Sequence, residues 1–192
     1  MEFTNYANLY IENLQKILNN INIEELKKIE EVFLDAYKND RIVYIMWNGG
    51  SASTASHWAC DFNKWTAHPW KKRFRFISLN DNIAHFTAIA NDISYDDIFS
   101  EQLKNILMKD DIVVVISASG NSKNIVKALE YTKIVWAKSV AIVWFTGWKA
   151  KEISDYSIYV DSMEYGPVED VHMMFDHLLS TYFKKAIEEW IE

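Results

Sequence analysis

Apolar residues along the chain alternate between helical spacing and short continuous runs. Over residues 5–20 they fall on one helical stripe, and a second helix is predicted over 23–38. Short apolar runs rich in β-branched residues predict buried strands. We expect strands at 41–46, 74–79, 111–117, 139–146 and 157–160. We expect further helices at 53–65, from about 83, at 95–108, 123–133 and 168–189.

The predicted order of elements indicates the fold class. Strands that are apolar throughout and separated by helices are typical of a parallel sheet covered by helices on both faces. At 192 residues, the chain is long enough for one sizeable core and short for two. The expected fold is therefore one doubly wound α/β domain with an extra N-terminal helix or two.

Composition narrows the class of protein. The net charge of -7 and the lack of a Lys/Arg cluster argue against a nucleic-acid surface. No apolar run approaches the length of a membrane span, and the first residues lack the pattern of a signal peptide. Cys60 is the single cysteine, which excludes an internal disulfide and fits a reducing compartment. We therefore expect a cytoplasmic globular protein.

Two loops of similar character follow two of the predicted strands. They are NGGSAS at 48–53 and SASGNS at 117–122, and each leads into a predicted helix. Small residues, hydroxyls and free N–H groups at a helix start favour anion binding. Because neither loop has the lysine of a P-loop or the spaced glycines of a dinucleotide site, a single phosphate is the expected ligand. Helix capping by Ser and Asn is the alternative for either loop alone.

Two pairs of polar residues have a spacing suited to a shared site. His57 and Asp61 lie four apart on a predicted helix, so both can reach one metal ion, although an i,i+4 surface pair is the simpler interpretation. Glu169 and His177 lie eight apart on the last predicted helix, broadly on one side.

These motifs together resemble a known family. NGGSAS with the histidine that follows it, TAIAND, ISASGNS and EDVHMMFDH resemble, in this order, the sugar isomerase (SIS) domain family, and within it the phosphoheptose isomerase branch. The resemblance covers residues 5–188. It implies a three-layer fold with five parallel strands, as a single SIS domain over 1–192. Residues 1–40 would serve oligomerisation, and 41–192 would form the core with its terminal helix.

The resemblance also implies a reaction. It is the interconversion of sedoheptulose 7-phosphate and D-glycero-D-manno-heptose 7-phosphate, for lipopolysaccharide or capsule synthesis, by a homotetramer with active sites at subunit interfaces. Such an aldose–ketose exchange passes through an enediol and needs a base, an acid and a group that stabilises the enediolate.

The residues of the site are transferred by motif. The resemblance implies a zinc ion bound by His57, Asp61, Glu169 and His177, with Asp61 and His177 also as acid and base. The implied substrate-binding residues are Asn48, Gly49, Gly50, Ser51, Ser53, Asn91, Asp92, Ser117, Ser119, Ser122 and Glu169. The family pattern has Glu at position 61 and Gln at 169, but both changes keep an oxygen donor.

Two non-catalytic alternatives remain open. One is the SIS branch that binds the replication initiator protein, which His177 argues against because that branch lacks the second histidine of the terminal helix. The other is a sugar-phosphate sensor. His172 is expected to be structural, with a hydrogen bond at a subunit contact, and no role is expected for His68, His85 or Cys60.

Tryptophan and glycine have unusual frequencies. The chain has 5 Gly and 8 Trp, although an average glycine content of about 7% would give roughly 13. Five Trp stand where the family pattern has a small residue, usually glycine: Trp47, Trp65, Trp136, Trp144 and Trp148. We hypothesise that they are UGA codons that the native host reads as glycine. The alternative is genuine tryptophan, with Trp47 closing the sugar pocket.

Overall fold

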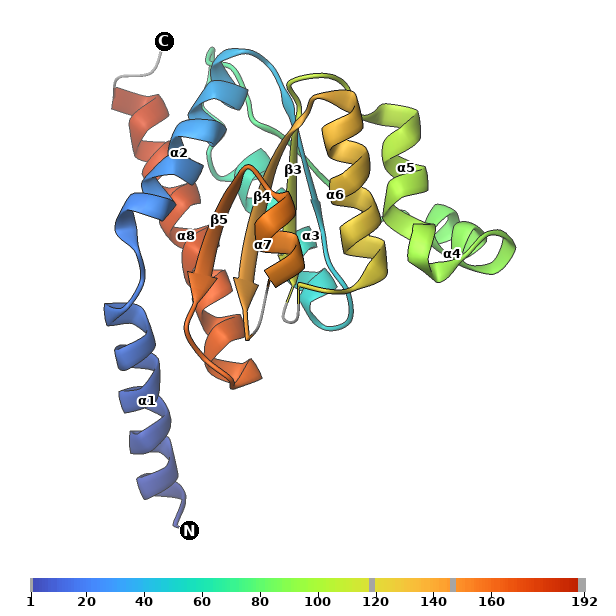
Figure 1. The fold of residues 1–192 in the computed structure, drawn as a ribbon. Coiled ribbons are helices and arrows are strands. Elements are labelled where there is room, and N and C mark those ends of the chain that lie inside the picture. The colour runs from blue at the N-terminus through green and yellow to red at the C-terminus, as the bar shows by residue number, and fades with distance from the viewer. Residues whose placement is uncertain (1, 118–119, 146–147, 190–192) are drawn as a thin grey trace.

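The computed structural model describes residues 2–117, 120–145 and 148–189. Its five strands form one parallel sheet in the order β2-β1-β3-β4-β5 (Figure 1). The strands are β1 Ile42–Met46, β2 Arg75–Ser78, β3 Ile112–Ser117, β4 Lys138–Trp144 and β5 Tyr156–Val160. The strand order reverses between β1 and β3, so these neighbours flank the switch point at which ligands bind in such sheets.

Helices connect the strands and flank the sheet. They are α1 Phe3–Asn19, α2 Ile23–Lys38, α3 Ser51–Lys64, α4 Ile83–Asp92, α5 Ile98–Ile106, α6 Lys123–Val135, α7 Trp148–Ile153 and α8 Tyr165–Glu189, with the 3₁₀ turn η1 Tyr95–Asp97 before α5. The helix predicted at 95–108 is thus a 3₁₀ turn followed by a shorter helix. Helix α7 was not predicted, and position 146 of the expected fourth strand lies outside the described residues.

The central strands β1, β3 and β4 each contribute side chains to two separate cores, which makes the fold three-layered as predicted. Along β1, Val43 and Ile45 pack into one core with side chains of α2, α3 and α8. Tyr44 and Met46 point the other way and pack with side chains of α4, α5, α6 and α7. This alternation follows from the two-residue period of a strand and explains why the strands are apolar on both faces.

Helix α1 extends beyond these layers. Figure 1 shows α1 projecting from the body of the domain, beside the lower part of α8. The Tyr10 hydroxyl on α1 donates a hydrogen bond of 2.6 Å to Asp170 on α8. Among the helices that the structure describes, none has both the length and the apolar content needed to cross a bilayer.

Candidate functional site

A pocket of about 310 Å³ lies at the carboxyl ends of β1 and β3. We call it the loop pocket; its lining residues are Trp47, Asn48, Gly49, Gly50, Ser51, Ser117, Ser122, Trp144, Tyr165 and Glu169. It brings together predicted residues from both loops. Ser53 is exposed and does not line it, and Ser119 lies outside the described residues.

The first loop turns sharply at Gly49. Its φ of +63° is left-handed, and glycine adopts this conformation without steric cost. Two hydrogen bonds hold Trp47, two residues before Gly49. Asn80 Oδ1 accepts from the Trp47 N–H at 3.0 Å, and Asn80 Nδ2 donates to the Trp47 carbonyl at 2.8 Å. The backbone N–H groups at the start of α3 are thereby fixed at the pocket.

Two polar side chains tie the loops together across the switch point. The amides of Asn48 and Asn124 exchange two hydrogen bonds, of 3.0 and 2.8 Å. The Tyr95 hydroxyl also donates to Asn48 Oδ1 at 3.1 Å. Sequence reasoning missed Asn124 and Tyr95, because each lies far along the chain from the residue that it holds.

Helices α3 and α8 run side by side from this pocket in the same direction. At their starts, the Ser51 hydroxyl donates to Glu169 Oε1 at 3.1 Å. Further along, His177 Nε2 lies 4.0 Å from Asp61 Oδ2. The two helices therefore connect the loop pocket to a second group of polar residues about two to three turns away.

That second group consists of His57, Asp61, Asp176 and His177, which we call the His/Asp cluster. One donor atom from each lies within 4.8 Å of the others. His57 Nε2 is 3.5 Å from Asp61 Oδ2 and 4.0 Å from Asp176 Oδ2. Both histidine side chains are about half exposed, whereas Asp61 is 13% and Asp176 0% exposed. In the cluster, the two carboxylates are therefore largely buried, whereas the two imidazoles are accessible to solvent.

The carboxylates of Asp61 and Asp176 have few hydrogen bonds to compensate their negative charge. Within the described residues, Asp61 Oδ2 and both oxygens of Asp176 have no hydrogen-bond partner. Burial, and then the nearby Asp61 charge, raise the pKa of Asp176 to about 8. Two imidazoles and two carboxylates are a donor set that suits zinc, and a bound cation would compensate the paired negative charges.

Three of the four predicted metal ligands lie in the His/Asp cluster, and Asp176 is an additional member. Glu169 is not in the cluster. Its exposed carboxylate lines the loop pocket and accepts the hydrogen bond from Ser51. The structure thus places Glu169 with the predicted substrate-binding residues and apart from the other predicted ligands.

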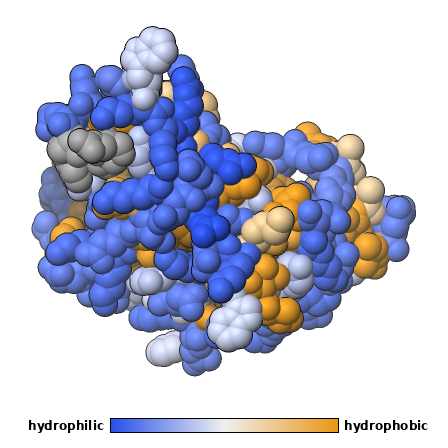
Figure 2. Space-filling model, turned by 90° about the horizontal axis from the view of Figure 1, so that it is seen from above, coloured by the Kyte–Doolittle hydropathy of each residue, from blue (hydrophilic) through white to orange (hydrophobic). Residues whose placement is uncertain are grey.

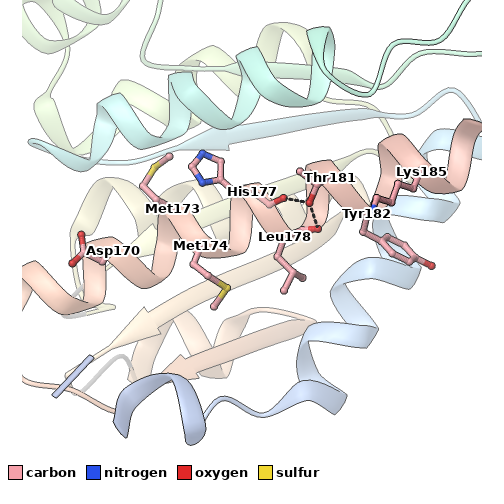
Figure 3. A pocket seen from close by; sticks show the side chains of 8 residues that line it. All are labelled: Asp170, Met173, Met174, His177, Leu178, Thr181, Tyr182 and Lys185. Atoms are coloured by element: carbon pink, nitrogen blue, oxygen red, sulfur yellow. Dashed lines mark hydrogen bonds between the residues drawn. The ribbon is translucent and has the colours of Figure 1, made fainter. Parts of the chain in front are cut away.

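An open groove of about 720 Å³ runs along α8 beside the cluster (Figure 3). Its lining residues are Asp170, Met173, Met174, His177, Leu178, Thr181, Tyr182 and Lys185. In Figure 3, His177 points from α8 toward the teal helix α3, whereas Met174 and Leu178 point to the opposite side. His177 thus lies at the border between the His/Asp cluster and a mainly apolar surface.

Asn91 and Asp92 lie apart from both regions. They are exposed at the end of α4, where the Asn91 amide donates to Asp92 Oδ1 at 2.7 Å. Neither residue lines the loop pocket of the single chain. The link from this segment to the site is Tyr95, three residues further on.

His172 is buried in its own chain, contrary to the predicted hydrogen bond at a subunit contact. Its ring lies 4.9 Å from that of Trp47 and 4.6 Å from that of Trp144, and it is 1% exposed. Within the described residues, neither ring nitrogen has a hydrogen-bond partner. Burial lowers the pKa of His172 to about 3, so the imidazole is neutral.

Trp47 and Trp144 fill the inner wall of the loop pocket. Their rings lie 5.2 Å apart and both side chains are buried. The Trp144 indole N–H has no hydrogen-bond partner in the described part of the chain. With glycine at both positions, the imidazole of His172 would no longer be covered by these rings.

The other three tryptophans of the hypothesis are exposed. Trp136 ends α6 with a φ of +61°, a left-handed conformation that favours glycine. Trp65 has a φ of -77°, which any residue adopts. Trp148 begins α7. Trp70, which was not among the five, has a φ of +68° and is also fully exposed.

Comparison with known proteins gives consistent matches. A family model described as SIS domain matches residues 9–143. A phosphoheptose isomerase of Helicobacter pylori is 34% identical over 169 residues, covering 88% of this chain and 86% of that protein. Another, of Thermodesulfovibrio yellowstonii, is 35% identical over 159 residues, covering 82% and 78%. The solved structure of a phosphoheptose isomerase from Francisella tularensis has the same fold, with a TM-score of 0.85 at 23% identity, covering 96% of this chain and 100% of that one.

Proposed function

The chain belongs to the SIS domain family and, within it, to the phosphoheptose isomerases, and from this premise we propose that it interconverts sedoheptulose 7-phosphate and D-glycero-D-manno-heptose 7-phosphate. One observation carries the proposal. A pocket of hydroxyls and helix N-termini and a His/Asp cluster lie on the same two helices, α3 and α8. A sugar phosphate needs the first for its phosphate, and an enediol reaction needs the second for its protons.

In this proposal the phosphate binds in the loop pocket. Ser51, Ser117 and Ser122 offer hydroxyls there, and α3 and α6 begin at it. From Glu169 in this pocket to His177 in the cluster, α8 advances eight residues, or about 12 Å. This matches the scale of an extended seven-carbon sugar phosphate. Glu169 would then accept hydrogen bonds from sugar hydroxyls.

The proton transfers are assigned to Asp61 and His177. One removes the proton from the carbon next to the carbonyl, and the other moves the proton between the two oxygens of the enediol. A zinc ion, when bound at the cluster, would polarise the carbonyl oxygen as a Lewis acid. Asp61 is one methylene shorter than the Glu of the family pattern, so the substrate carbon must approach it more closely.

We extend the proposal to a homotetramer in the cytoplasm that serves surface polysaccharide synthesis. Large apolar side chains are exposed on the projecting helices: Phe3, Tyr6, Leu9 and Ile11 on α1, and Ile83 on α4. In Figure 2, hydrophobic surface gathers on the side where α4 and α5 lie in Figure 1. Such patches are typical of interfaces, and light scattering after size exclusion measures the assembly directly.

The test is an isomerase assay with sedoheptulose 7-phosphate, with and without zinc. It compares two proteins, one with tryptophan and one with glycine at positions 47, 65, 136, 144 and 148. Aldose phosphate formed by either version supports the isomerase, and formation by the glycine version alone also supports the codon hypothesis. If neither version converts the sugar, the isomerase proposal is wrong.

A second candidate function is a sugar-phosphate sensor, which the packing of Trp47 and Trp144 favours. Their indoles occupy the inner wall of the loop pocket, where they would crowd the sugar. A sensor would bind the phosphosugar without converting it. Calorimetric titration beside the assay separates this outcome from a protein that neither binds nor reacts.

A further inference from the structure

We infer that Asp176, rather than Glu169, is the fourth ligand of a zinc site whose other ligands are His57, Asp61 and His177. The inference deepens the proposed function, but zinc binding can be measured whether or not the protein is an isomerase. It concerns a residue that the motifs do not assign. Asp176 precedes His177 on α8 and lies within an apolar stretch of the sequence.

The burial of Asp176 is the first argument. Its side chain is 0% exposed, and within the described residues neither carboxylate oxygen accepts a hydrogen bond. A buried carboxylate without a partner is strongly unfavourable, so proteins pair such a group or use it to coordinate a metal ion. The nearest ionisable atoms on the facing helix α3 belong to the cluster itself: His57 Nε2, at 4.0 Å, and the second carboxylate, Asp61.

The distances within the cluster are the second argument. Ligand atoms on one tetrahedral zinc lie about 3.4 Å apart, given Zn–N and Zn–O bonds of about 2.0–2.1 Å. The pair His57–Asp61 stands at 3.5 Å, and the pairs His57–Asp176 and His177–Asp61 at 4.0 Å. The remaining pairs lie within 4.8 Å of each other, so the donor atoms have to approach by at most about 1.4 Å, which a rotation of the half-exposed imidazoles can provide.

The position of Glu169 is the third argument. It lies seven residues before Asp176, which places it about 10 Å nearer the N-terminus of α8. Its carboxylate accepts a hydrogen bond from Ser51 at the loop pocket. Reaching the cluster would break that bond, whereas Asp176 is already within reach of the other three donors.

The experiment compares two matched variants, Asp176→Ala and Glu169→Ala, which each remove the carboxylate and leave no donor atom in its place. Zinc affinity is measured by competition with a chromogenic chelator, and the ligand field by the visible spectrum of the cobalt(II) form. We expect Asp176→Ala to weaken zinc binding by at least about 100-fold and to alter the cobalt spectrum. Glu169→Ala should change the affinity by less than about 3-fold and leave the spectrum as in the unmodified protein.

A third variant separates ligand loss from misfolding. Asp176→Val replaces the buried charge by a small apolar side chain, so in EDTA it should melt at or above the temperature of the unmodified protein. It should also lose the rise in melting temperature that zinc produces. Zinc affinity kept in Asp176→Ala, or lost in Glu169→Ala, overturns the inference, as does an unmodified protein that binds no zinc. If zinc binds as expected but the protein has no isomerase activity, the inference is supported and only the proposed function is contradicted.

Discussion

The loop pocket and the His/Asp cluster lie on the same pair of helices but consist of different kinds of polar group. The pocket uses backbone N–H groups and hydroxyls, and its loops are braced by neutral side chains such as Asn48 and Asn124. The cluster uses ionisable side chains, two of which are largely buried. Under the proposed function, this difference corresponds to a division of labour, with binding of the substrate at the helix starts and its chemistry further along.

The largest effect that tests this division is expected at the cluster. His177→Asn removes an acid–base group, so kcat should fall by about 10³-fold while the KM for sedoheptulose 7-phosphate changes little. Steady-state kinetics at saturating zinc measure both constants. His85→Asn, on α4 and outside both regions, is the control and should leave both unchanged. A variant that raises KM and keeps kcat would place His177 in binding and end the proposed division.

The next effect concerns stability beneath the loop pocket. His172 is neutral in the fold with a pKa of about 3, against about 6.5 when unfolded. Between these values the unfolded chain binds one more proton, so the free energy of unfolding falls as pH decreases below about 6.5. His172→Leu should remove about 1.4 kcal/mol per pH unit of this dependence. Urea denaturation at pH 4.5 to 7.5 measures it, and equal slopes in both proteins would mean that His172 is protonated in the fold.

A smaller effect is expected in the pocket itself. The Ser122 side chain makes no capping hydrogen bond in α6, so its hydroxyl is available to the phosphate. Ser122→Ala should raise KM about 10-fold with kcat kept, since a hydrogen bond to a charged group contributes about 1.5 kcal/mol. Ser53→Ala is the matched control, because Ser53 is exposed and outside the pocket. Equal KM values in the two variants would argue against phosphate binding at this loop.

The smallest expected effect is on stability, at two tryptophans outside both regions, and it tests the codon hypothesis. Trp136 is 76% exposed and adopts a φ of +61°, so Trp136→Gly should raise the free energy of unfolding by about 1 kcal/mol. Trp148, which is exposed within α7, is the matched control, and Trp148→Gly should lower it by up to about 1 kcal/mol. Chemical denaturation measures both. If both changes lower the free energy of unfolding, position 136 favours tryptophan, which would contradict the codon hypothesis at that position.

Motifs made the loop pocket predictable. Glycines and hydroxyls between a buried strand and a helix have a local signature, and NGGSAS and SASGNS both carry it. The spacing of His57 and Asp61 likewise follows from the helical period alone. Fold class was predictable for the same reason, since the period of apolar residues changes between strands and helices.

Asp176 could not be predicted, because its burial depends on how α8 packs against α3. In the sequence it is one acidic residue beside an apolar stripe, a pattern typical of a helix with one solvated face. The placement of Glu169 was open for the same reason, since residues seven apart on a helix share a side but can reach different sites. Helix α7 has six residues, too few to establish a period.

The most direct test of the account follows sedoheptulose 7-phosphate by NMR in D₂O with zinc-loaded protein, for the printed chain and for the variant with glycine at positions 47 and 144. The account predicts that the glycine-bearing protein forms the aldose with deuterium at C2, because the enediol takes its new proton from a group that exchanges with solvent. If the sugar binds but its spectrum stays unchanged with both proteins, neither proton transfer occurs. That result would contradict the isomerase and leave a binding protein.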